Sequence, residues 1–356
     1  MTFYQELQLN QGGSKNLIRH STDPKEKIRH MAVYVFKILL TLAFCMAFVI
    51  SYSKIFGDEN SIVGVVVLLC VMVFRYADFG FHAKHSISAM VMIFLILAFG
   101  PRLANSTGAA AGLLINGICI FVLMFLGCHN VVLANHSTLV LGYLLLYGYD
   151  VSGTLYVWRL AGIVLGAALT GIVYYRNHRK KQYKREMKSL FEEFRLDSTR
   201  TRWQMTVTLG VASALFIGEV LNIPRSMWIG IAAMSVIVPF QTDLKERVKG
   251  RIPGNIAGGI LFLVICTVLP ESAYSYIGII GGIGVGFSAT YRWQAVFNSL
   301  GAMAVAVTFL GIPGAVFFRI FNNVFGAVYG QIFRNLCDTV INRIMEAKNR
   351  KLCMES

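Results

Sequence analysis

The stretch "MAVYVFKILLTLAFCMAFVIS", from Met31 to Ser51, decides the class of fold, because Lys37 is its only charged residue. A helix of about 20 apolar residues is long enough to cross the ~30 Å hydrocarbon core of a membrane. Similar runs recur along a chain that is 56% hydrophobic and 14% charged, whereas soluble domains carry about 25% charged residues. A soluble protein of 356 residues could not bury so many such helices. The sequence therefore predicts an all-α, polytopic membrane protein.

About twelve transmembrane helices are expected, in two sets of six. The first set lies near 31–53, 60–74, 86–101, 108–127, 130–148 and 153–175, and the second near 203–221, 226–240, 253–269, 273–290, 295–310 and 314–333. Around these sets, the prediction places a cytoplasmic N-terminal segment at 1–30, a first six-helix repeat at 31–175, a basic cytoplasmic linker at 176–202, a second six-helix repeat at 203–333 and a cytoplasmic tail at 334–356.

The positions of the basic residues predict the orientation. The net charge is +15, and most of the 33 lysine and arginine residues fall in the termini, the linker and the loops on one side of the predicted membrane. Such an excess marks the cytoplasmic side. Both termini and the linker are therefore expected in the cytoplasm, in a multi-pass protein of the plasma (inner) membrane. We expect the linker run "RNHRKKQYKREMKSLFEEFR" (176–195) to contact anionic membrane lipids and not nucleic acid.

The two sets of helices resemble each other in the order of their polar and small residues. An offset of 165 residues places Asp78 on Asp243, and an offset of 160 places both Arg159 on Arg319 and Gly166 on Gly326; Asn135 and Asn298 also match, at an offset of 163. Because each set has an even number of helices, both have the same orientation. The pattern predicts parallel repeats that are related by an axis along the membrane normal.

Two matched segments are unusually short. They are "SIVGVVVLLCVMVF" (61–74) and "SMWIGIAAMSVIVPF" (226–240). At about 1.5 Å per residue, neither helix would reach across a ~30 Å core. Short segments at corresponding places in two repeats point to the central site of a transporter. Tilted helices or a locally thinned bilayer are the other interpretation.

The stretch "PFQTDLKERVKGRIPGNIAGGILF", which follows the second short segment, carries a family resemblance. It reads as a proline, a charged loop and then Arg251-x-x-Gly254-Asn255-x-x-Gly258 at the start of the next helix. This resembles the FUSC superfamily of membrane proteins, which includes the aromatic acid exporters and the fusaric acid resistance proteins. The plant aluminium-activated malate transporters look like distant relatives. The resemblance implies a multi-helix membrane transporter or channel for organic anions.

The chain departs from the family pattern in three places. Asn255 stands where threonine is usual, and "HAKHSISAM" (82–90), at the equivalent place in the first half, lacks both glycines. Only a short tail is expected after the last helix, where many relatives carry a large cytoplasmic domain. The departures concern the identity of the substrate more than the fold.

The glycines and the basic residues of this stretch have separate expected roles. Gly254 and Gly258 lie four residues apart on one helix face, so that a neighbouring backbone can approach closely. The same packing role is expected for Gly166 and Gly326. At the cytoplasmic mouth, three basic side chains are expected either to anchor to lipid headgroups or to gather anions: Arg247, Lys249 and Arg251.

Two arginines lie inside apolar runs, although arginine is costly to place in a membrane. Arg159 lies in "VWRLAGIVLGAALTG" and Arg319 in "FFRIFNNVFGAVYGQ", each seven residues before a glycine. One interpretation is lipid anchoring, in which the long side chain reaches the interface. The other is that both face one pathway and bind an organic carboxylate through their planar, bidentate donors. Asn135 and Asn298, inside the fifth helix of each half, are further candidates for lining that pathway.

No Walker-type phosphate loop, paired catalytic carboxylates or activated nucleophile is apparent in the sequence, and no histidine or cysteine group has metal-ligand spacing. We therefore expect a protein that is not an enzyme and that needs no metal or cofactor. The sequence favours a transporter or channel for small organic anions, by resemblance an exporter of aromatic or other carboxylic acids. The alternative is a non-transporting membrane scaffold for envelope assembly. Assembly into a homo-oligomer is compatible with either function.

Overall fold

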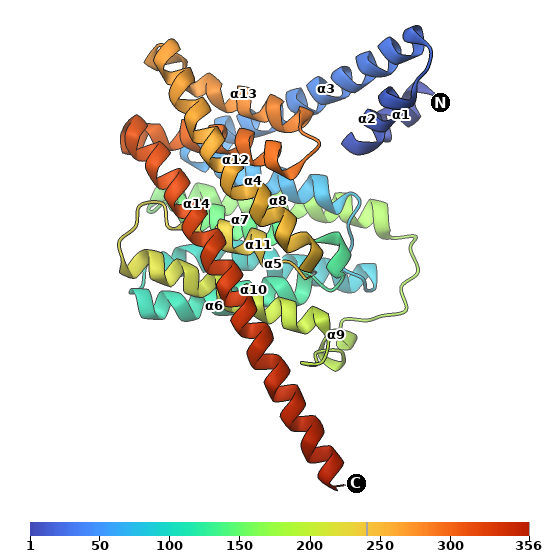
Figure 1. The fold of residues 1–356 in the computed structure, drawn as a ribbon, viewed down its shortest axis with the longest axis vertical. Coiled ribbons are helices and arrows are strands. Elements are labelled where there is room, and N and C mark those ends of the chain that lie inside the picture. Colours follow the sequence, from blue (N-terminus) through green and yellow to red (C-terminus); the bar gives the residue numbers. More distant parts are fainter. Residues whose placement is uncertain (240, 356) are drawn as a thin grey trace. The chain divides into compact units, whose positions relative to one another are not determined.

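A computed structural model describes the backbone of residues 1–239 and 241–355, and the side chains of 1–239, 247–274 and 276–347. In this part of the chain every regular element is a helix and there is no strand (Figure 1). The all-α fold predicted from the sequence is confirmed.

The α-helices of the described residues follow one another with short connections. They are α1 (Phe3–Gln8), α2 (Gln11–His20), α3 (Pro24–Phe56), α4 (Ser61–Phe74), α5 (Ala83–Asn105), α6 (Ala109–Gly127), α7 (His136–Gly148), α8 (Thr154–His178), α9 (Lys188–Glu192), α10 (Thr199–Val220), α11 (Met227–Val236), α12 (Gln241–Val268), α13 (Tyr274–Phe287) and α14 (Tyr291–Glu355). Short 3-10 turns lie at Asp58–Asn60, Val131–Leu133 and Glu271–Ala273.

Seven of the described helices are long and apolar enough to cross a membrane: α3, α5, α6, α8, α10, the part of α12 from Arg247 to Val268, and α14 as far as Ala347. This confirms a multi-pass membrane protein. Each of the twelve apolar segments expected from the sequence overlaps a helix, but a helix is not by itself a crossing. The count of twelve crossings, the two-repeat layout, the domain boundaries and the orientation in the membrane stay predictions.

Several helix ends differ from those expected. α3 begins at Pro24 instead of 31, α12 begins at Gln241 instead of 253, and α14 continues to Glu355, through the segment expected as a tail. The extra turns are rich in Lys, Arg and Glu, which are good helix formers, and hydropathy alone does not detect them. The charged loop expected before Arg251 is therefore helical. The side chain of Asp243 lies outside the described residues.

A glycine separates the last two apolar segments. Gly311 interrupts α14 with φ 65° and ψ 174°, a backbone conformation that is open to glycine and strained for other residues. Pro313 follows it and lacks a backbone N–H group. The two helices expected at 295–310 and 314–333 are thus joined end to end through a kink.

The chain forms two compact units. Unit 1 consists of Met1–Ala47 and Glu246–Phe321, and unit 2 consists of Phe48–Lys245 and Asn322–Ser356. Unit 1 thus holds α1, α2, the first part of α3, nearly all of α12, α13 and the first part of α14. Unit 2 holds the end of α3, α4 to α11, the first residues of α12 and the rest of α14.

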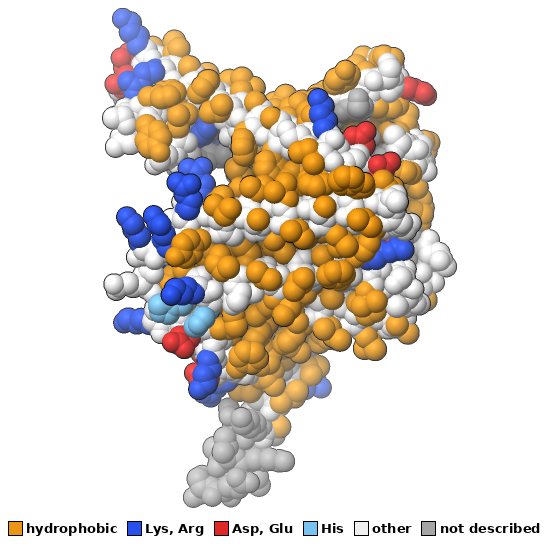
Figure 2. Space-filling model, turned by 180° about the vertical axis from the view of Figure 1, so that it is seen from behind, with side chains coloured by type: hydrophobic (Ala, Val, Ile, Leu, Met, Phe, Trp, Pro, Cys, Tyr) orange, Lys and Arg blue, Asp and Glu red, His pale blue; other side chains and the backbone are white. Residues whose placement is uncertain are grey.

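The two short helices α4 and α11 lie in the interior of unit 2. Nine of the ten residues of α11 are buried, and α4 packs against α7 and α8. Apolar side chains are instead exposed on the longer helices, for example Leu103, Val157 and Val164 at more than half of their surface. Figure 2 shows how widely such side chains cover one face. Because protein covers the short helices, they need not reach both surfaces of a membrane.

Glycines set the distance between the short helices and the last helix of each half. A Cβ atom on Gly166 of α8 would lie 2.2 Å from Val67 of α4, and one on Gly326 of α14 would lie 2.3 Å from the Ile229 carbonyl oxygen of α11 and 2.7 Å from Ala232. Val67 and Ala232 are themselves related by the offset of 165 residues. The same close packing therefore occurs at matched positions in both halves of the sequence.

The basic linker is tied to the turn between α6 and α7. Glu193 accepts hydrogen bonds from Arg185 (2.7 Å) and Arg200 (3.1 Å), and Arg200 Nη1 also lies 3.1 Å from His129 Nε2. Burial of the imidazole, together with the nearby Arg200 charge, lowers the pKa of His129 to about 4. His129 is therefore neutral at physiological pH, and its Nε2 accepts from Arg200.

We expect Gly326→Ala to destabilise the protein by roughly 1–3 kcal/mol, because the added methyl group meets a backbone oxygen that cannot move aside. Gly166→Ala should also be destabilising, because the methyl group meets both Cγ atoms and the Cβ of Val67, a β-branched side chain that is restricted at χ1. The measurement is the midpoint of thermal unfolding of the purified protein in detergent. Gly117→Ala on α6 is the matched control, since no atom lies within 4 Å of its Cβ position. An unchanged midpoint for Gly326→Ala would contradict the packing.

Candidate functional site

Arg159 lies inside the protein and not at its lipid-facing surface. Its side chain is 3% exposed on α8. Nε donates to Asn60 Oδ1 at 3.0 Å, and Nη2 lies 3.4 Å from the Glu59 carbonyl oxygen. Asn60 is itself fully buried, and its Nδ2 donates to the carbonyl oxygens of Phe56 and Leu155. Arg159 therefore binds the turn that leads into the short helix α4.

The partners of the Arg159 guanidinium are neutral. Among the described side chains, no carboxylate oxygen lies within 4 Å of a guanidinium nitrogen of Arg159, the distance that defines an ion pair. The carboxylate of Asp150 pairs instead with Arg102, at 2.6 Å between Oδ2 and Nη1. A buried cation without a contacting counter-ion is costly and leaves a positive potential that favours a nearby anion.

Arg319 is also buried, at 7% exposure on α14. It lies in unit 1, whereas Arg159 lies in unit 2, and their convergence on one pathway stays a prediction. The next turn of α14 carries Asn322 and Asn323, both fully buried. Asn322 Nδ2 donates to the carbonyl oxygens of Pro224 (2.9 Å) and Arg225 (3.1 Å), which ties α14 to the start of α11. This asparagine pair was not singled out from the sequence, although "FNNVF" is an evident polar interruption of an apolar run.

The two matched asparagines have different surroundings. Asn135 was expected inside the fifth helix, but it immediately precedes α7, because Ala134 before it has a left-handed backbone conformation (φ 51°). It is fully buried, and its Nδ2 donates to the carbonyl oxygens of Gly127 (2.9 Å) and Asp78 (3.2 Å). Asn135 thus joins two turns. Asn298 lies within α14, is exposed, and lines a cavity of about 890 Å³ in unit 1.

Gly254 and Gly258 form a contact between α12 and the first part of α14. A Cβ atom on Gly254 would lie 2.8 Å from the Arg292 carbonyl oxygen, and one on Gly258 would lie 2.6 Å from that of Val296. Asn255, between them, accepts from Ser299 Oγ at 2.7 Å. The Asn255 side chain therefore forms a hydrogen bond between α12 and α14 at the same contact.

The three basic residues expected at a mouth differ in exposure. Lys249 is exposed, whereas Arg251 is 8% exposed within α12, where Nη1 donates to the Tyr291 hydroxyl at 2.9 Å. The Arg247 guanidinium stacks over the Tyr291 ring, 5.3 Å from its centroid. Arg247 and Arg251 thus bind the start of α14, and of the three only Lys249 is fully available to headgroups or anions.

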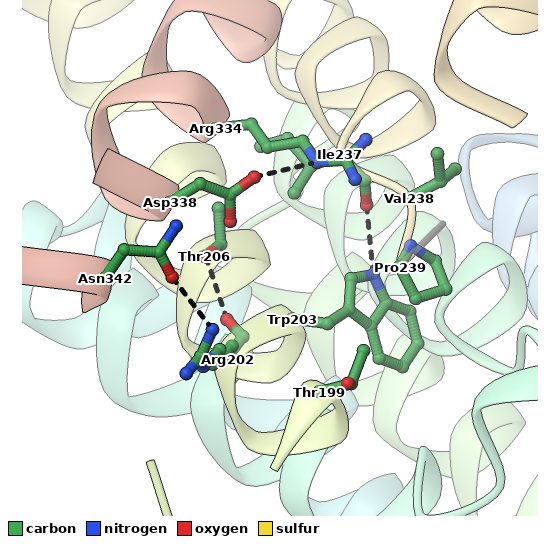
Figure 3. A pocket seen from close by; sticks show the side chains of 10 residues that line it. All are labelled: Thr199, Arg202, Trp203, Thr206, Ile237, Val238, Pro239, Arg334, Asp338 and Asn342. Atoms are coloured by element: carbon green, nitrogen blue, oxygen red, sulfur yellow. Dashed lines mark hydrogen bonds and ion pairs between the residues drawn. The ribbon is translucent and has the colours of Figure 1, made fainter. Parts of the chain in front are cut away.

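A polar pocket of about 260 Å³ in unit 2 was not predicted (Figure 3). It lies where the start of α10, the residues after α11 and the C-terminal part of α14 come together. Arg202 Nη1 donates to Asn342 Oδ1 at 3.2 Å, and Trp203 Nε1 donates to the Ile237 carbonyl oxygen at 3.0 Å. Arg334 Nε lies 3.7 Å from Asp338 Oδ2. Its polar groups bind one another, and they join α10 to α14.

Part of the chain matches a known protein family. Residues 212–333 match the model of the fusaric acid resistance protein-like family, a range that runs from α10 through α14 and contains the Arg251-to-Gly258 motif. Neither the search of curated proteins nor that of solved structures returned a match. The resemblance noted in the sequence is confirmed over this range: residues 212–333 are similar to the fusaric acid resistance protein-like family.

Proposed function

We propose that the chain moves small organic anions across a membrane, as an exporter or channel for aromatic or other carboxylic acids. The observation that carries this proposal is the burial of the Arg159 guanidinium among neutral partners inside an apolar helix. Ionisable groups at such places in membrane proteins commonly mark the route of an ion or substrate. Arg319 is buried at the matched position of the other half. A family named for resistance to an aromatic carboxylic acid is in keeping with the same chemistry.

The alternative function, a non-transporting scaffold, assigns both arginines to lipid anchoring. An anchor needs its guanidinium at the lipid or water interface. Exposures of 3% and 7% do not support that assignment. Trp158, beside Arg159, is 53% exposed, so an interfacial role fits the neighbouring residue better than the arginine.

Uptake of a labelled aromatic carboxylate into liposomes should fall about tenfold or more in Arg159→Gln and in Arg319→Gln, since each removes a fixed positive charge worth ~1.4 kcal/mol or more to the anion. Arg159→Lys should restore only part of the flux, because an ammonium lacks the planar fork.

Lys54→Gln is the matched control, because it removes an exposed positive charge that has no contact with the Arg159 site. It should leave flux within about twofold of the wild type. Equal protein content and a monodisperse elution profile must be verified for every variant. Wild-type flux in both glutamine variants would end the proposal that these arginines act in transport.

The proposed orientation can be tested separately from flux. Gln182→Cys in the exposed linker should react with a membrane-impermeant maleimide only after cells are opened, because basic loops stay in the cytoplasm. Ser106→Cys, in the exposed turn between α5 and α6, should react in intact cells. Labelling is measured above that of the wild-type cysteines, and the opposite pattern would invert the proposed topology.

A further inference from the structure

A cavity of about 890 Å³ lies wholly within unit 1. Its walls come from the turn between α1 and α2, from α3, from α13 and from the first part of α14. Its volume falls within the 300–1,000 Å³ that is usual for small-molecule sites.

Lys37 supplies the only charge among the residues described as lining the cavity. It lies six residues into the apolar run of α3, and its ammonium donates to the Leu9 carbonyl oxygen (2.9 Å) and to Ser14 Oγ (2.6 Å). Both partners are neutral, and no described carboxylate lies within 4 Å. An ammonium has three donors, and these two hydrogen bonds use two of them. The ammonium also lies 5.5 Å from the centroid of the Tyr34 ring, which is neutral as well. A partly buried, uncompensated cation in this position favours an anionic group.

The other walls are apolar and rich in glycine. Ile38 and Leu42 of α3 face α13, where Cβ atoms on Gly286 and Gly282 would lie 2.8 and 3.2 Å from them. Further along, Gly278 of α13 and Gly301 of α14 have no atom within 4 Å of their Cβ positions, which places open space beside them. The cavity can therefore take the flat apolar body of a ligand as well as its charged group.

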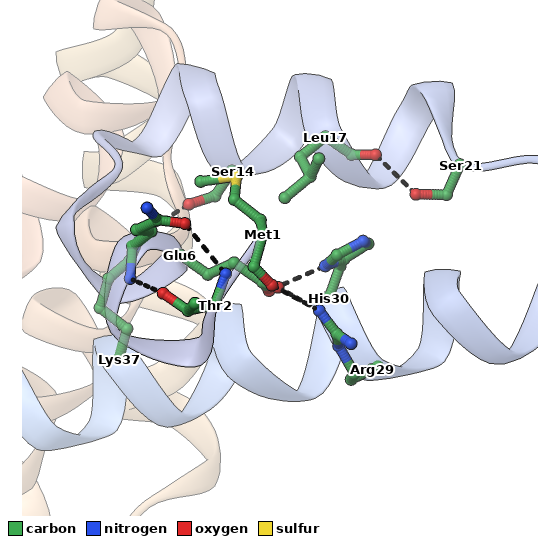
Figure 4. Close-up of polar contacts among 10 residues, drawn as sticks. Met1, Thr2, Glu6, Ser14, Leu17, Ser21, Arg29, His30 and Lys37 are labelled. Carbon is green, nitrogen blue, oxygen red and sulfur yellow. Dashed lines mark hydrogen bonds and ion pairs between the residues drawn. The ribbon is translucent and has the colours of Figure 1, made fainter.

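The N-terminal segment covers one side of this cavity and is fastened at both ends. Glu6, 3% exposed, pairs with Arg29 (2.6 Å) and His30 (2.8 Å) on the first turns of α3 (Figure 4). On the other side, Gln11 and Lys15 donate to the carbonyl oxygens of Gly286 and Phe287 at the end of α13, at 3.0 and 2.8 Å. These contacts hold the turn that lines the cavity over the Lys37 ammonium.

We propose that this cavity is a binding site for an amphiphilic anion, whose charged head binds the Lys37 ammonium while its apolar or aromatic body lies along the glycines of α13 and α14. The assignment rests on the proposed function in one respect, that a carboxylate of this kind would be the transported substrate. A free aromatic carboxylate and an anionic lipid share the required chemistry.

The probe is 2-naphthoate, titrated calorimetrically into the full-length protein in phosphatidylcholine nanodiscs, with empty discs as the blank. Lys37→Gln should weaken binding roughly tenfold or more, and Lys37→Arg should restore most of it. The neutral 2-naphthamide should bind weakly and without regard to residue 37. Lys54→Gln is the matched control, since Lys54 is an exposed lysine of the same helix outside the cavity.

A second variant tests the cavity without touching the charge. Gly301→Leu fills open space and should abolish naphthoate binding, whereas Gly117→Leu on α6, also beside open space, should not. In phosphatidylglycerol discs, weaker naphthoate binding identifies a lipid as the natural occupant, and unchanged binding identifies the free carboxylate. Naphthoate binding that survives both Lys37→Gln and Gly301→Leu would overturn the proposal.

Binding and flux separate this proposal from the proposed function. Binding that depends on Lys37, in a protein that gives no carboxylate flux, would refute transport and leave the site in place. Flux through the wild-type protein, together with naphthoate binding that is indifferent to Lys37 and Gly301, would support transport and refute this site.

Discussion

The close approach of α8 and α14 to two short buried helices is the constraint on which unit 2 depends. The first N–H groups and the last C=O groups of a helix have no partner within the helix. Because α11 is short, these groups lie among the apolar segments of the protein at both of its ends. Non-helical backbone at membrane depth is tolerated only where protein or water surrounds it. Gly166 and Gly326 let the backbones meet closely enough to enclose α4 and α11. Larger side chains at Gly166 and Gly326 would push α8 away from α4 and α14 away from α11.

The same approach determines the surroundings of Arg159. Because α8 lies tightly on α4, its guanidinium reaches Asn60 and Glu59 at the start of that helix and does not reach the lipid. In the other half, Asn322 of α14 binds Pro224 and Arg225 just before α11. In both cases, polar side chains on the last helix of a half hold the entrance to a short helix. This provides hydrogen bonds for the turn, and at Arg159 it also leaves a buried positive charge.

The first helix of each half contacts a helix of the other half. α10 packs along α6 within unit 2, and Ile38 and Leu42 of α3 contact Gly286 and Gly282 of α13 within unit 1. Each first helix therefore contacts a helix of the other half of the sequence. The α3 contact is lined on one side by glycines, and this leaves space where larger side chains would have closed it. The N-terminal segment and Lys37 complete the walls of that space.

From the sequence alone, the chain is predicted to lie in a membrane, and most of its helices can be located. Runs such as 31–51 and 203–221 have one stable arrangement in lipid, which is a helix whose backbone hydrogen bonds are satisfied internally. The sequence also predicted close helix packing at Gly166 and Gly326, each of which lies on nearly the same helix face as the arginine seven residues before it. It did not determine the start of α12, because the apolar run begins only near 253 and hydropathy does not detect the charged helical turns before it. The sequence did not indicate that Arg159 binds Asn60, 99 residues away, or that Lys37 donates to Leu9 and Ser14. Contacts between residues so distant in the chain depend on how the helices pack, and this packing cannot be predicted from a local sequence pattern.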